Sequence, residues 1–158
     1  MWWMSLALAA PPTAVVLPSQ AVEGSVSVAM PPSEALAHLA DPTWVREIDG
    51  GTTRVTVRER EGACVLADYS SPSLVMTVRY TIRQCPTGHG YLSTLVQSAD
   101  FAAYESEWSV AAEGAGSRLT YRVRVEPKLP LPLGLITGTI RGDVLAMMEA
   151  FAAKLGGA

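Results

Sequence analysis

The sequence predicts an α+β domain in which a curved antiparallel sheet of six to seven strands surrounds a long C-terminal helix. Three observations support this prediction. Polar and apolar side chains alternate over about 75 residues from Thr53 onward, as they do in half-buried strands. Turns that contain Gly or Pro interrupt this pattern. Apolar residues then recur every three or four positions from 136 to 155, which is typical of an amphipathic helix.

The composition fits one globular domain. The chain has 158 residues, of which 49% are hydrophobic and 17% are charged. This length is enough for a single core, and so apolar a composition is unlike that of a disordered chain. The formal net charge of −3 leaves no basic excess to neutralise phosphates. We therefore expect no nucleic-acid partner.

Residues 1–21 are predicted to be a leader that precedes a single domain over residues 22–158. Residues 1–16 carry no charge, but Pro11 and Pro12 limit the apolar run to about ten residues, half the length of a membrane-spanning helix. Ser19-Gln20-Ala21 has the small residues that signal peptidase prefers. We predict a signal peptide and export. The missing Lys or Arg near the N-terminus favours the alternative, a disordered leader on a cytoplasmic protein.

Two short helices are predicted between the first strand and the rest of the sheet. Residues 25–30 alternate in polarity and form the first strand. Pro32 and Glu34 then begin a helix that continues through Ala40, since proline and an acidic residue favour the first helical turn. A second short helical segment starts at Asp41 and ends near Gly50-Gly51.

The remaining strands are predicted at residues 53–60, 64–69, 74–83, 91–97, 102–112 and 118–126. Side-chain matching sets the register of the last two. Trp108 opposite Tyr121 gives an inward aromatic pair, and Glu107 opposite Arg122 gives an outward pair of opposite charges, which are the pairs that stabilise antiparallel strands. A slip of one residue would mix the two faces.

The two cysteines are predicted to be unpaired thiols. If the turn after strand 64–69 is centred near Ser71, Cys64 faces Val78 in the next strand. Cys85 then lies more than about 20 Å farther along that strand. A disulfide requires Cα atoms within about 7 Å of each other.

Three segments carry a resemblance to a known group of proteins. They are the strand that leads into a proline-started helix at residues 26–35, the aromatic-rich strand at 101–108, and the Gly-rich turn with residues 118–121 before a proline-rich helix entry. From Val22 to Leu155 the chain resembles the SRPBCC superfamily. These START-like helix-grip domains include polyketide cyclase/dehydrase-like and coenzyme-Q-binding members. The resemblance implies a cavity for a lipid, isoprenoid or polyketide-like ligand, without a universal catalytic residue.

The inward face of the sheet and the apolar stripe of the last helix are the expected walls of that cavity. Core packing alone would also explain the inward aromatic residues, whereas in a pocket their hydroxyl groups would orient a ligand. Methionines would make the walls adaptable. The candidate ligand-binding residues are Met76, Val78, Tyr80, Tyr104, Trp108, Tyr121, Ile140, Val144, Met147, Met148 and Phe151.

Evidence for catalytic or metal-binding residues is weaker. Glu59 and Asp68 share the apolar parity of their strands, and inward carboxylates could act as acid/base groups. The alternative places both at strand ends in water. His38 and His89 are far apart in the chain and have no cluster of cysteines or carboxylates beside them. We expect no metal site and no cofactor.

Three classes of function remain open. The leading one is the binding or carriage of a hydrophobic small molecule between the sheet and the last helix. The second is a cyclase/dehydratase-type enzyme that uses an inward carboxylate or a tyrosine. The third is an interaction module whose partner docks on residues 129–133 or on the outward arginines. No transmembrane segment is predicted, and transient contact with a membrane stays open. The outward arginines are Arg54, Arg58, Arg79, Arg83, Arg122 and Arg124.

Overall fold

The structure is a computed structural model that describes residues 10–73 and 76–156. Its strands are β1 (Thr13–Val16), β2 (Val22–Val28), β3 (Arg54–Glu61), β4 (Cys64–Ser73), β5 (Met76–Pro86), β6 (Gly90–Ser98), β7 (Phe101–Glu113) and β8 (Gly116–Pro127). Its helices are α1 (Pro32–Ala40), the 3-10 helix η1 (Pro42–Trp44), α2 (Val45–Ile48) and α3 (Leu133–Leu155).

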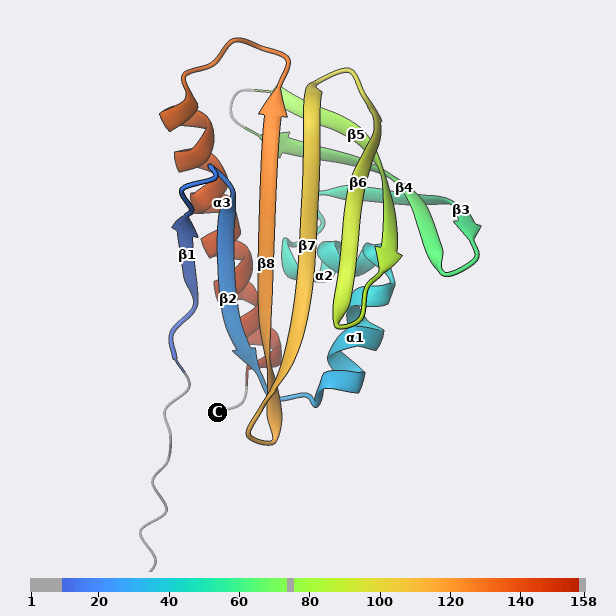
Figure 1. Cartoon of the computed structure of the whole chain (residues 1–158), viewed down its shortest axis with the longest axis vertical. Coiled ribbons are helices and arrows are strands. Elements are labelled where there is room, and N and C mark those ends of the chain that lie inside the picture. Colours follow the sequence, from blue (N-terminus) through green and yellow to red (C-terminus); the bar gives the residue numbers. More distant parts are fainter. Residues whose placement is uncertain (1–9, 74–75, 157–158) are drawn as a thin grey trace, which may run out of the picture.

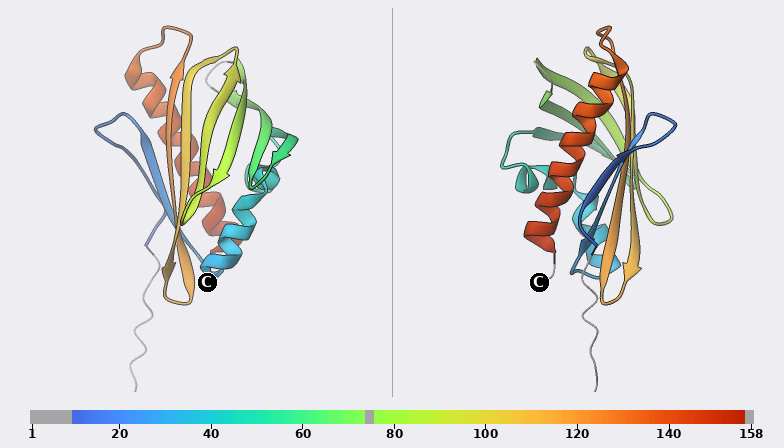
Figure 2. Two further views of the ribbon diagram at one scale, coloured as in Figure 1. Left: turned by 45° about the vertical axis from the view of Figure 1, so that its right-hand side comes forward. Right: turned by 90° about the vertical axis from the view of Figure 1, so that its left-hand side faces the viewer.

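The described strands form one antiparallel sheet in the order β1-β2-β8-β7-β6-β5-β4-β3. The sheet curls so that β1 and β2 lie beside α3, while β3, β4 and β5 curve round to the side of the sheet on which α3 lies and stand across from the helix (Figure 1, Figure 2). Helix α1 lies toward the end of the molecule away from the β8–α3 connection, and α2 lies nearer the middle, in contact with β3 (Figure 1). This arrangement confirms the predicted α+β helix-grip fold, and β1 raises the strand number above the six to seven expected.

Strand β1 lies within the segment that the sequence predicts to be a leader. It pairs with β2, with Thr13 opposite Ser25. Ala14 is buried, and its carbonyl accepts a hydrogen bond of 2.9 Å from Arg141 Nε on α3. Residues 1–9 of the predicted leader lie outside the described residues. Cleavage of the leader therefore remains a prediction, and in the full chain β1 belongs to the sheet.

The long helix α3 packs mainly on β2 and β1, at one edge of the sheet. Gly24 in β2 permits this contact because a Cβ atom there would lie 2.5 Å from Val144 Cγ1 and 3.0 Å from Met148 Cγ. Met148 and Phe151 are fully buried below this contact, in a core that also includes Trp108. The solid part of the interior thus lies where α3 meets β2.

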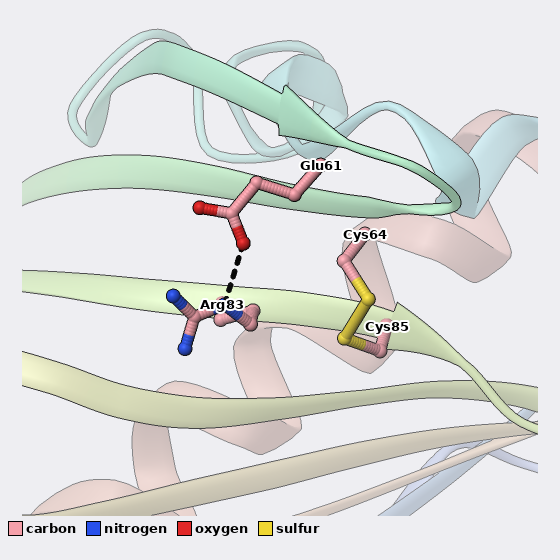
Figure 3. Close-up of a disulfide and its surroundings, with 4 residues drawn as sticks. All are labelled: Glu61, Cys64, Arg83 and Cys85. Atoms are coloured by element: carbon pink, nitrogen blue, oxygen red, sulfur yellow. Dashed lines mark hydrogen bonds and ion pairs between the residues drawn. A yellow bond between two sulfur atoms is a disulfide. The ribbon is translucent and has the colours of Figure 1, made fainter.

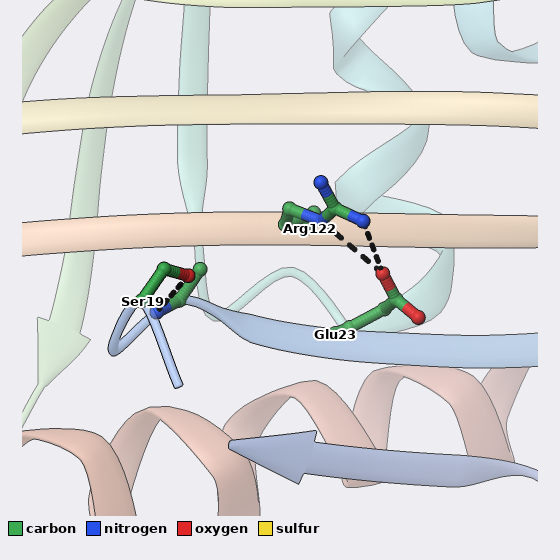
Figure 4. Close-up of polar contacts among 4 residues, drawn as sticks. Ser19, Glu23 and Arg122 are labelled. Atoms are coloured by element: carbon green, nitrogen blue, oxygen red, sulfur yellow. Dashed lines mark hydrogen bonds and ion pairs between the residues drawn. The ribbon is translucent and has the colours of Figure 1, made fainter. Parts of the chain in front are cut away.

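The predicted register of the β7–β8 hairpin is confirmed. Trp108 lies opposite Tyr121, and Glu107 lies opposite Arg122. The guanidinium of Arg122 nevertheless forms its ion pair with Glu23 of β2, with a distance of 2.7 Å from Nη2 to Oε2 (Figure 4). On the outer face this ion pair therefore links β8 to β2 and not to β7.

The prediction of two unpaired thiols is wrong, because Cys64 and Cys85 form a disulfide (Figure 3). Strand β4 continues to Ser73, which lies opposite Met76, so a turn near Ser71 comes too early. The actual register places the cysteine Cα atoms 4.3 Å apart. Pro72 fits in this strand because β3 pairs with β4 only as far as Ser70, and edge positions tolerate proline.

We predict that this disulfide stabilises the fold substantially. The two cysteines are 21 positions apart, and a cross-link that closes a loop of this length contributes about 3 kcal/mol in the chain-entropy model. The Cys64→Ala/Cys85→Ala variant should lose about that much free energy of unfolding in urea. Reductant should shift the midpoint of the wild type toward that of the variant and leave the variant unchanged. Equal midpoints for oxidised and reduced wild type would contradict this account.

Candidate functional site

A cavity of about 810 Å³ lies between α3 and the concave face of β4 to β8. This volume is within the range of pockets that hold drug-sized ligands. Apolar and aromatic side chains form most of its wall. The lining residues that are also exposed to solvent define its rim, and they are Thr52, Pro72, Met76, Ala99, Lys128, Leu129, Asp143 and Ala146.

Nine of the eleven predicted ligand-binding residues line this cavity. They are Met76, Val78, Tyr80, Tyr104, Trp108, Tyr121, Ile140, Val144 and Met147. Met148 and Phe151 do not line it, since both are fully buried in the core on the β2 side. They belong to the same apolar helix stripe, but this stripe continues past the cavity to the place where helix and sheet are in contact. That the nine residues bind a ligand remains a prediction.

The tyrosines of the concave face form a connected row of rings. Tyr69 stacks on Tyr80 with 5.2 Å between ring centroids, and Tyr80 lies 5.0 Å from Tyr104. Trp108 and Tyr121 are 4.6 Å apart. Tyr69 was absent from the predicted site, although it shares the parity of buried Val65 and Ala67 in β4, which could have identified it. The row offers flat aromatic surface to a ligand.

The hydroxyl groups of this row also interact. Tyr104 donates a hydrogen bond to Ser106 Oγ over 3.1 Å, and its oxygen lies 3.4 Å from that of Tyr121. Burial raises the pKa of Tyr80 and of Tyr121 well above the ordinary tyrosine value, so both remain neutral. Their rings still have accessible surface although protein surrounds them, and this surface faces the cavity.

The two predicted acid/base candidates do not line the cavity. Asp68 lies on the outer face, where it accepts a hydrogen bond of 2.5 Å from Thr81 and lies 3.5 Å from Arg58 Nε. The inward parity of β4 is that of Ala67, so the parity assigned to Asp68 was wrong. Glu59 is exposed and follows a β-bulge that shifts the register of β3. The alternative interpretation, in which both carboxylates lie in water, fits the structure.

Three other aspartates line the cavity instead. Asp49 accepts hydrogen bonds from the backbone N–H groups of residues 51–53, and Asp100 accepts one of 2.7 Å from Arg79 N. Asp143 on α3 has no hydrogen-bond or ion-pair partner within the described residues, and partial burial raises the pKa of its carboxyl group. Asp143 lies four positions after Thr139, a spacing that places both on one helix face beside the apolar stripe.

The histidines lie in different surroundings. The ring of His38 packs near Trp44 and Phe151, at centroid distances of 6.5 and 6.4 Å, while His89 is in the β5–β6 connection. Residues 10–73 and 76–156 contain no group of three or more His, Cys, Asp or Glu side chains placed to hold a metal ion. Within the same residues, no helix is long and apolar enough to cross a membrane.

A family model described as polyketide cyclase / dehydrase and lipid transport matches residues 19–156. The chain belongs to this family. The match covers β2 through α3 and therefore every element that lines the cavity. The solved structures below show that the fold of this family is shared. No curated protein matches the chain in sequence.

Solved structures share the fold of this family member at low sequence identity. A START superfamily protein from Mycobacterium smegmatis matches with a TM-score of 0.76 and 15% identity, over 85% of this chain and 96% of that one. The Zhui aromatase/cyclase from Streptomyces matches with a TM-score of 0.61 and 18% identity, over 85% of this chain and 84% of that one. The lipid transfer and protein localization domain of human StarD13 matches with a TM-score of 0.62 and 18% identity, over 83% of this chain and 76% of that one.

We predict that Asp143→Asn stabilises this domain at neutral pH. Burial raises the folded-state pKa of Asp143 above its ordinary value of 3.8, so the folded chain binds this proton more tightly than the unfolded chain does. Ionisation therefore opposes folding increasingly as pH rises from about 4 through the folded-state pKa. The variant should melt above the wild type at pH 7, and the difference should shrink toward pH 4.

The matched control for this measurement is Glu149→Gln, which removes a carboxylate from an exposed position of α3 that does not line the cavity. It should leave the melting temperature nearly unchanged at both pH values. An Asp143→Asn variant that melts with the wild type at pH 7 would show that the surroundings of Asp143 do not penalise its charge.

Proposed function

We propose that this protein binds and carries a hydrophobic small molecule of the lipid, isoprenoid or polyketide-like class between its sheet and α3. The observation that carries the proposal is the cavity itself, whose volume of about 810 Å³ is enclosed largely by apolar and aromatic side chains. A solid core would have placed the tyrosine rings against α3. Membership of a family described by lipid transport as well as by cyclase and dehydrase activity supports the same function.

The rim of the cavity supports a carrier further. Leu129 and Met76 are exposed lining residues, and Leu133 and Leu135 are exposed at the start of α3. An interaction module would present exposed apolar side chains in place of a cavity, whereas here Leu129 and Met76 line one. Exposed apolar side chains at a cavity mouth suit the transient membrane contact that the sequence suggests, since an apolar ligand could then enter without crossing water.

A cyclase/dehydratase-type enzyme is the second candidate. One observation favours it: Asp143, whose carboxyl pKa is raised by burial, borders the same cavity as the tyrosine hydroxyl groups. A carboxyl group that holds its proton to higher pH is suited to general acid catalysis. The tyrosines, with pKa values raised by burial, would act only as neutral hydrogen-bond donors. Conversion of the bound molecule by the wild type but not by Asp143→Asn would establish this candidate.

We predict that filling the cavity displaces the ligand. The Ile140→Trp/Met147→Trp variant places two indole rings in the cavity from α3. Crowding of this kind typically costs 1–3 kcal/mol, or about tenfold or more in affinity. Native mass spectrometry of protein purified without detergent should show a bound apolar molecule on the wild type and little or none on the variant. The control Glu149→Trp/Ala153→Trp adds the same rings to exposed positions that do not line the cavity, and it should retain the ligand. A wild type that is uniformly free of ligand would overturn the proposal.

We also propose that the protein works in an oxidising compartment outside the cytoplasm. The disulfide between Cys64 and Cys85 supports this location because cytosolic thiols are kept reduced. The predicted signal peptide supports it independently. Mass spectrometry of the protein from the exported fraction of its native host should find the oxidised disulfide and an N-terminus shortened by cleavage. Full-length, reduced protein confined to the cytosol would contradict this location.

A further inference from the structure

The charged groups of the cavity wall have an uneven distribution. Of the chain's 12 lysines and arginines, Lys128 alone lines the cavity, whereas Asp49, Asp100 and Asp143 all do. Lys128 is exposed at the rim, and its Nζ donates a hydrogen bond of 2.9 Å to the carbonyl of Ser98. No cation of the described residues therefore reaches the interior, where an enclosed carboxylate would need one.

Four of the arginines form ion pairs with carboxylates on the outer face of the sheet. Within the described residues, the ion pairs of this face are Arg58–Asp68, Arg83–Glu61, Arg118–Glu113 and Arg122–Glu23. Arg83 and Glu61 lie beside the disulfide on the side of the sheet that faces solvent (Figure 3). Positive charge is thus held away from the cavity by the alternation of side chains along each strand.

The hydroxyl groups on the inner face of the sheet are neutral, and they form hydrogen bonds with one another. Tyr104 has one hydroxyl hydrogen, which it donates to Ser106, so the 3.4 Å contact requires Tyr121 to donate to the oxygen of Tyr104. Ser106 in turn donates a hydrogen bond to the hydroxyl oxygen of Tyr121, which partly offsets the effect of burial on the pKa of Tyr121. Ser106 is buried and lines the cavity. The three hydroxyl groups therefore form a neutral cluster at the cavity wall, and a hydroxyl group of this cluster can rotate to donate its hydrogen to a ligand.

We propose that the cavity selects neutral, ring-bearing molecules with a hydrogen-bond-accepting oxygen and rejects carboxylates of the same shape. The inference rests on the proposed function, and it adds the chemical class of the ligand. Burying a carboxylate without a cationic partner costs several kcal/mol, and nearby aspartates increase that cost. A carbonyl or ether oxygen pays no such penalty and can accept a hydrogen bond from Ser106 when its hydroxyl group rotates from Tyr121 toward the ligand. The row of rings from Tyr69 to Tyr121 packs against flat molecules.

Three probes with similar ring systems separate these contributions. 2-(Hydroxymethyl)anthraquinone is neutral and has carbonyl oxygens, anthraquinone-2-carboxylate adds a negative charge, and 2-methylanthracene has no oxygen. Quenching of tryptophan fluorescence reports binding, because Trp44 and Trp108 line the cavity. At pH 7.5 we expect the neutral quinone to bind at least about tenfold more tightly than the carboxylate. Asp143→Asn should narrow this ratio by improving carboxylate binding.

Ser106→Ala tests the hydrogen bond separately. It should weaken binding of the neutral quinone about fivefold, which is typical of one lost hydrogen bond, and leave 2-methylanthracene unaffected. Ser109→Ala is the matched control because Ser109 occupies the opposite face of the same strand, three positions along β7 and opposite Thr120, and does not line the cavity. It should change neither affinity.

The outcomes separate this inference from the function on which it rests. Equal affinity for the quinone and the carboxylate would overturn the selectivity and leave the carrier function standing. If Ser106→Ala weakened the binding of the quinone and of 2-methylanthracene equally, the proposed role of the Ser106 hydroxyl group would be overturned. Failure of all three probes to bind would overturn both the inference and the proposed function. The comparison of probes on the wild type needs no variant and is therefore independent of any folding defect.

Discussion

The close approach of α3 to β2 at Gly24 determines where this protein is solid and where it is hollow. Val144 and Met148 occupy the space that a side chain at position 24 would need. Because this contact holds the helix at the β1–β2 edge, β4 and β5 near the other edge stand across from the helix and do not pack on it (Figure 2). The core forms on one side of Trp108 and the cavity on the other.

The division of charge follows from the same geometry. Residues of alternate parity reach the outer face, where arginines pair with carboxylates such as Asp68 and Glu23. Residues of the other parity face α3, and these are mainly apolar or carry neutral hydroxyl groups. The aspartates reach the cavity from loops and from the helix, not from the strand pattern. A ligand therefore meets an interior that can donate hydrogen bonds but offers no positive charge.

The local pattern of polar and apolar residues was sufficient to predict those elements whose partners are close in sequence. The β7–β8 register, the extent of α3 after Pro132 and the inward parity of β5 all follow from neighbouring residues. Errors arose where a turn or a bulge sets the register. Placing a turn at Ser71 separated the cysteines, and the bulge between Val57 and Glu59 changed which side chains of β3 face inward. A single misplaced turn shifts every later pair of the ladder.

The candidate site was predicted well on the sheet and less well on the helix. Alternation identifies the inward residues of a strand wherever the register is right, as for Val78 and Tyr80. Helical periodicity cannot tell where a helix leaves the sheet, so Met148 and Phe151 looked equivalent to Met147. Whether inward residues enclose a core or a cavity depends on how far the sheet curves, which no local pattern encodes.

A crystal structure of the protein purified without detergent tests the central claim most directly. The account predicts elongated non-protein density between α3 and the row formed by Tyr80, Tyr104 and Tyr121, with an oxygen of the bound molecule within hydrogen-bonding distance of Ser106 Oγ. An interior in which Ile140 and Met147 pack directly against those tyrosines, leaving no space for a ligand, would contradict it.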